Sequence, residues 1–183
     1  MKDSEILGGR RKALENYFFE KHEHELIEKL KKEAENKKVE TELIKKLNVS
    51  SALAAKIVHA GFNLETLAVL TLVPLIEVAW ADGILDFNEK KIILTQAKID
   101  HISQELLLPW VESGPSQELC QLWEAYVQTL KEHMEQADWV QFKEGILEHS
   151  KRVAEASGGI LGLIGSVSKA EKDVLNRIEK VFA

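Results

Sequence analysis

The sequence predicts an all-α protein, a compact bundle of about eight to ten helices with an extended, charged N-terminal helix. Proline, which removes a backbone donor and breaks helices, occurs only three times in 183 residues and never before Pro74. The first 48 residues are rich in Glu, Lys, Leu and Ala, which favour helix. No alternating apolar and polar pattern is long enough to indicate a strand.

Charge divides the chain into two parts. Residues 1–48 carry 12 Lys and Arg with 11 Asp and Glu, whereas residues 49–183 carry 12 and 19. We therefore predict a charged helical N-terminal extension over 1–48 and an acidic helical domain over 49–183. An acidic domain repels a phosphate backbone, which argues against general nucleic-acid binding. The mixed charges of the extension are typical of an exposed helical surface.

The extension is predicted as one long helix, or two joined ones, over residues 5–38. Its apolar residues form two stripes about a third of a turn apart around the helix axis. These stripes are Leu7, Leu14 and Phe18, and then Leu26, Leu30 and Ala34. We expect a kink near His22 or a change of packing partner. The aromatic run 17–19 is expected to dock on the domain or on a second chain.

Further helices follow from turn and capping signals. Residues 41–60 are predicted as two short helices around a turn at 48–50, with Gly61 ending the second. Leu75 to Ala81 is apolar except for Glu77 and is predicted to be the most deeply buried segment. A helix over 87–98 is expected to turn Phe87, Ile93, Leu94 and Ala97 inward. The remaining helices are predicted over 103–112, 117–135, 139–156 and 169–182, with caps at Ser116, Asp138 and Ser168.

The residue types that carry catalysis show no catalytic spacing. None of the six histidines follows a glutamate at the Glu-x-x-His spacing of di-iron bundles. The single cysteine, Cys120, excludes a disulfide framework and indicates a reducing compartment. The Gly158–Gly165 segment lacks the strand and Gly-Lys-Ser/Thr ending of a phosphate loop. It is interpreted as a loop that packs its Ile and Leu side chains into the core, with a membrane-touching or partner-binding loop as the alternative.

An acidic motif at residues 77–89 is the most informative stretch. Its second half matches a calcium loop, but Val78 and Trp80 stand where two side-chain oxygens belong. A tight turn between helices is the alternative, with Gly83 in a special backbone conformation and the last acidic residues capping the next helix. A surface for a protein partner or a weakly bound divalent cation stays open. The residues concerned are Glu77, Asp82, Asp86 and Glu89.

This motif resembles the TerB-like tellurite-resistance family. The resemblance lies in a helix ending in Ala81-Asp82-Gly83, then aliphatic residues, then Glu89 and a basic amphipathic helix. It is good over residues 67–98 and weaker to about 156, and two flanking stretches resemble an uncharacterised bacterial subgroup. The resemblance implies a compact helical bundle in the bacterial cytoplasm with a non-enzymatic role in stress response. It also implies a cation at Asp82, Asp86 or Glu89.

These observations favour a non-catalytic binding or regulatory module. One alternative is a structural protein that self-associates through its N-terminal helix. The other is an enzyme whose acid and base meet only in the folded chain, for example Glu77 with a histidine. We expect a protein partner or self-association, no nucleic acid, no stable membrane insertion, no resident cofactor and a cytoplasmic location. No charged start leads into an apolar run, so we expect no signal peptide.

Overall fold

The computed structural model describes residues 2–156 and 167–183, with side chains described from residue 21 onward except at position 22. Within these residues the chain forms eight α-helices and one short 3-10 helix, and no strand. The predicted all-α fold is therefore confirmed. The helices are α1 (Lys2–Leu47), α2 (Ser51–His59), η1 (Leu67–Leu72), α3 (Val73–Ala79), α4 (Phe87–Ile99), α5 (Gln104–Ser113), α6 (Gln117–His133), α7 (Gln136–Ala156) and α8 (Lys169–Val181).

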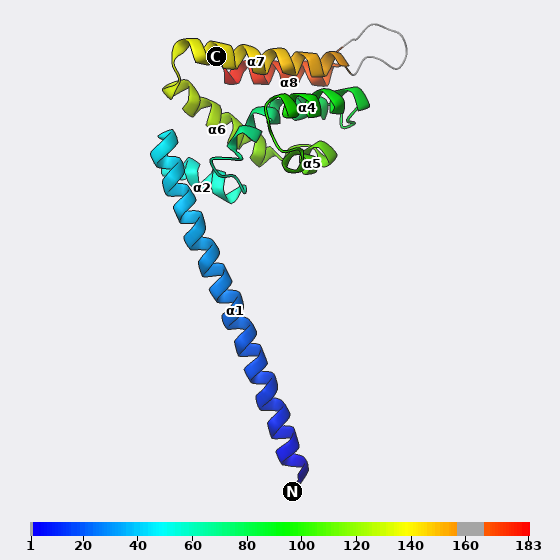
Figure 1. The fold of residues 1–183 in the computed structure, drawn as a ribbon. Coiled ribbons are helices and arrows are strands. Elements are labelled where there is room, and N and C mark those ends of the chain that lie inside the picture. The colour runs from blue at the N-terminus through cyan, green and yellow to red at the C-terminus, as the bar shows by residue number, and fades with distance from the viewer. Residues whose placement is uncertain (1, 157–166) are drawn as a thin grey trace.

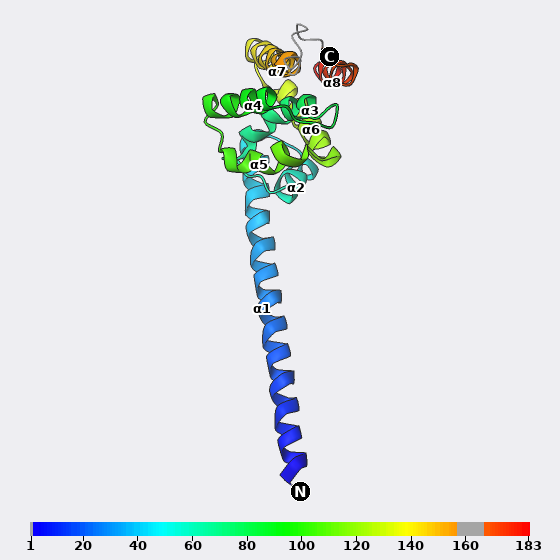
Figure 2. The same cartoon turned by 90° about the vertical axis from the view of Figure 1, so that its right-hand side faces the viewer.

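The N-terminal helix α1 is a single element of 46 residues that leaves the body of the molecule. Figures 1 and 2 show from two sides that most of its length extends beyond the other helices. Its last turns pack against α2, where Leu43 is fully buried. The predicted boundary between residues 38 and 41 does not exist, because 41–47 continue α1. The helix is continuous through residue 22, and the alternative of a kink there or a change of packing partner stays a prediction.

The body is built around α3. This helix contacts α4, α6, α7 and α8, and α7 lies beside α8 on the side of the body away from α1 (Figures 1 and 2). Six of the seven α3 residues are buried, as the apolar run predicts, whereas Trp80 and Ala81 at the end of the predicted run 75–81 are only half-buried. The exception within α3 is Glu77. Pro74 occupies the first turn of α3, where its missing N–H leaves no hydrogen bond unmade.

Local capping signals determine where several helices begin. Ser50, Ser116 and Ser168 each accept a hydrogen bond from a backbone N–H of the first helical turn. Asp86 and Ser168 also form full capping boxes, each with the glutamate three residues later. The cap predicted at Asp138 is wrong, because α7 begins at Gln136 and places Asp138 within its first turn. The segment Gly158–Gly165 lies outside the described residues.

An aromatic cluster closes the end of the body where α6, α7 and the C-terminus meet. Trp123 and Trp139 lie 6.0 and 5.5 Å from Phe182, measured between ring centroids, and Phe142 also contacts this ring. Because Trp123 and Phe182 are at most 2% exposed, the cluster anchors the last residues of the chain to the core.

Candidate binding surfaces

The acidic turn connects α3 to α4 through a set of local hydrogen bonds. Gly83 has a φ of +85°, a left-handed conformation that disfavours residues with a Cβ. Asp82 Oδ1 accepts the N–H of Ile84 at 3.0 Å. Glu89 accepts the N–H of Asp86 at 2.8 Å, and Asp86 caps α4. Three of the four predicted site carboxylates thus hold the backbone of the turn.

Glu89 is unusual among these carboxylates because its side chain is only 2% exposed. Its pKa is raised from 4.5 to about 7. Burial is the largest cause, the Asp86 N–H acts against it, and the carboxylates of Glu171, Asp86 and Asp82 add to the rise. Glu171, the capping-box glutamate of α8, is also 2% exposed. The N-termini of α4 and α8 therefore bring two buried carboxyl groups into electrostatic contact.

Glu77, the fourth predicted residue, serves a different purpose. Its Oε1 pairs with the guanidinium of Arg177 on α8, whose Nη1 also donates to Glu124 of α6 at 2.9 Å. Its Oε2 is buried and makes no hydrogen bond. Burial lowers the pKa of Arg177. This network ties α8 to α3 and α6.

Two large apolar side chains project from the acidic turn. Ile84 is 73% exposed and Phe87 is 79% exposed, and they follow Asp82 and Asp86 closely in the sequence. The prediction that Phe87 faces inward is wrong, whereas Ile93 and Ala97 of the same helix are fully buried. The turn therefore presents an apolar and acidic surface to solvent.

The side chains that could bind a metal do not gather into one cluster in the part of the chain that the structure describes. There, no group of three or more His, Cys, Asp or Glu side chains is placed to hold a metal ion. Burial raises the pKa of Cys120 to about 11, which disfavours the reactive thiolate. His133 is held between Asn48 and the carbonyl of Thr129 at 2.7 and 2.8 Å.

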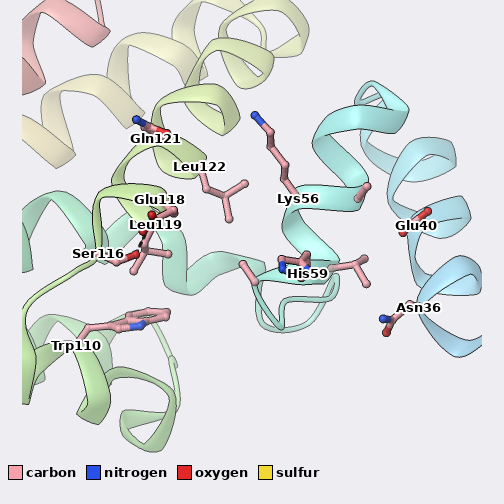
Figure 3. A pocket seen from close by; sticks show the side chains of 13 residues that line it. Asn36, Glu40, Lys56, His59, Trp110, Ser116, Glu118, Leu119, Gln121 and Leu122 are labelled. Atoms are coloured by element: carbon pink, nitrogen blue, oxygen red, sulfur yellow. Dashed lines mark hydrogen bonds between the residues drawn. The ribbon is translucent and has the colours of Figure 1, made fainter. Parts of the chain in front are cut away.

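A hollow of about 740 Å³ lies over the exposed side of α2. Figure 3 shows α2 between α1 on one side and α6 with Trp110 on the other. We call this hollow the α2 groove. Its lining residues are Asn36, Glu40, Ala55, Lys56, Val58, His59, Ala60, Trp110, Ser116, Glu118, Leu119, Gln121 and Leu122.

The α2 groove has an apolar floor and a charged rim. Ala55 and Ala60 keep the exposed side of α2 shallow, and Leu119 with Leu122 supplies an apolar wall from α6. Trp110 closes one end of the groove, and the centroid of its ring lies 5.6 Å from the ring centroid of the buried Phe62. The rim carries both signs of charge. These charged or titratable rim residues are Glu40, Lys56, His59 and Glu118.

The sequence alone did not identify this groove. Lys56 and His59 both lie on the exposed side of α2. Trp110 and Glu118, however, come from two other helices and reach the groove only through the packing of α2 on α6. The hydrophobic periodicity of a single helix cannot predict a groove that is lined by residues from several helices.

Comparison with known proteins gives no relative from which a function could be transferred: no protein family, no curated protein and no solved structure matches the chain. Within the described residues, no helix is both long and apolar enough to traverse a lipid bilayer.

Proposed function

We propose that this chain is a non-catalytic protein-binding module whose α2 groove receives an amphipathic helix from another protein. The observation that carries the proposal is the shape and lining of the groove, a hollow of about 740 Å³ open to solvent between α1 and α6. Helix-in-groove recognition needs an apolar trough with polar edges, which fixes the register of the bound helix.

The lining favours a helix over a small charged ligand. Small side chains at Ala55 and Ala60 allow the backbone of a bound helix to approach α2 closely. The rim offers Lys56 and His59 near the middle and Glu118 on α6, so its charges do not select an ion of one sign. A partner helix with apolar residues on one face and both charges at its margins complements this rim.

The acidic turn supplies a second contact surface in this proposal. Exposed Ile84 and Phe87 offer apolar area, and the adjacent Asp82 and Asp86 favour a partner segment with basic residues. The carboxylates of the turn are already engaged by backbone N–H groups, which favours a structural role over a cation site. The bacterial cytoplasm and a tellurite-type stress response are the setting that the TerB-like resemblance implies.

The groove is tested by filling it. A displayed library of amphipathic helical peptides is selected on the full-length chain, and the affinity of the selected peptides is measured by fluorescence anisotropy. Ala55→Trp fills the groove floor, whereas Ala52→Trp places the same ring on the exposed side of α2 outside the lining. We expect Ala55→Trp to weaken binding at least about tenfold and Ala52→Trp to leave it unchanged. Failure to select any peptide, or equal binding to both variants, would contradict the proposal.

A further inference from the structure

An apolar patch lies on the part of α1 that extends beyond the body. Leu26, Ile27 and Leu30 are 52%, 48% and 56% exposed, although they are among the bulkiest apolar residues of the helix. Figures 1 and 2 show no other helix alongside this part of α1. Burying such side chains against a partner is favourable because it removes apolar surface from water.

The patch faces away from the body. At 100° per residue, Leu43, the buried α1 residue that joins the core, lies roughly 140° around the helix from Leu30. Val39, which also packs against the core, lies roughly 180° from Leu30. A second helix can therefore lie along the Leu26–Leu30 face without displacing α2.

We propose that a second copy of this chain binds this face, with the two α1 helices antiparallel and their twofold axis beside Leu30. Positions equally far before and after residue 30 then lie opposite each other. Leu30 packs on Leu30 of the second copy, and Leu26 packs on Ala34 of the second copy. A twofold interface of this kind buries the same patch on both chains.

The charges beside the patch select both the partner and the orientation. In the antiparallel register, Glu23 lies opposite Lys37 of the second copy, and Lys29 lies beside Glu33 of the second copy. All four residues are exposed on α1. In a parallel pair each of them would instead face its own counterpart, and like charges at facing positions are destabilising. The face is thus complementary to itself only when the helices run in opposite directions.

A shallow hollow on α1 agrees with this register. It has a volume of about 540 Å³ and lies further along the helix, towards the body. Its lining residues are Ala34, Lys37, Lys38, Thr41, Glu42 and Lys45. The register places Leu26 of the second copy against Ala34, which lines this hollow.

The mass of the full-length chain in solution tests the association. Sedimentation equilibrium should give twice the chain mass for the wild type and the single-chain mass for Leu30→Asp. His24→Asp adds the same side chain at an exposed position roughly 120° around α1 and should remain a dimer. A monomeric wild type at micromolar concentration, or a Leu30→Asp variant that stays dimeric, would overturn the proposal.

Charge reversal tests the orientation. In the antiparallel register Glu23→Lys meets Lys37 of the second copy, so we expect the dimer dissociation constant to rise at least about tenfold. Adding Lys37→Glu restores opposite charges and should recover most of the lost affinity. A parallel pair would show neither effect, because Glu23 would then face only its own counterpart. Equal dissociation constants for all three proteins would therefore overturn the antiparallel arrangement.

Discussion

The carboxyl group of Glu89 makes the stability of the fold depend on pH. Its side chain is buried at the start of α4, and burial raises its pKa from 4.5 to about 7. A raised pKa means that the folded state binds the proton more tightly than the unfolded state. The resulting stabilisation is complete below pH 4.5 and is lost as the pH rises through 7.

Glu89→Gln removes this dependence because glutamine stays neutral and still offers an oxygen to the Asp86 N–H. Relative to this variant, we expect the wild type to lose about 2–3 kcal/mol of unfolding free energy between pH 4.5 and pH 8. Urea denaturation at the two pH values measures the difference. Glu105→Gln, at an exposed position in the first turn of α5, is the control and should track the wild type. A constant difference between wild type and Glu89→Gln would contradict the prediction.

Most capping residues were predictable because their signal is local, although the cap predicted at Asp138 was wrong. The pairs Asp86 with Glu89 and Ser168 with Glu171 were recognised from a spacing of three residues, and both form capping boxes. The burial of these glutamates was not predictable, since it depends on which helices pack over them. Phe87 shows the same limit. Helical periodicity predicts on which side of α4 Phe87 lies. It does not predict whether another element extends far enough along the helix axis to cover that side chain.

At the scale of the elements, one arginine joins the last helix to the body. Arg177 of α8 pairs with Glu77 of α3 and Glu124 of α6, although its side chain is 40% exposed. Glu77 is 17% exposed and would keep a poorly solvated charge if the arginine were removed. The pairing was not evident from sequence, because the acidic motif grouped Glu77 with the turn rather than with a helix a hundred residues later.

Replacing this arginine should loosen α8. We expect Arg177→Met to lower the unfolding free energy by about 1–2 kcal/mol, less than for a fully buried pair because water reaches the guanidinium. Chemical denaturation measures the change, and Lys172→Met, an exposed position of α8, is the matched control. Adding Glu77→Met should recover part of the loss, since it removes the unpaired charge. A double variant no more stable than Arg177→Met would argue that packing rather than charge is responsible.

At the scale of the whole molecule, α1 belongs to two parts of the protein at once. Its exposed portion carries the face proposed to bind a second copy, while Val39, Leu43 and Leu47 belong to the core of the body. The sequence shows the charge difference between 1–48 and 49–183, but this difference does not identify which residues pack into the core. The apolar residues at the end of α1 therefore make the structural core begin before residue 49.

Two truncations test where the folded body begins. A chain starting at residue 36 keeps Val39, Leu43 and Leu47, and its free energy of unfolding should lie within about 1 kcal/mol of that of full-length Leu30→Asp. This variant is the reference because association does not contribute to its stability. A chain starting at residue 49 removes all three side chains and uncovers the core of α2. We expect it to lose about 3–5 kcal/mol, the scale of large deletions from a core. Urea midpoints compare the three proteins. If the chain from residue 49 were as stable as the chain from residue 36, the end of α1 would not stabilise the body, and the burial of Leu43 would contribute nothing to the free energy of unfolding.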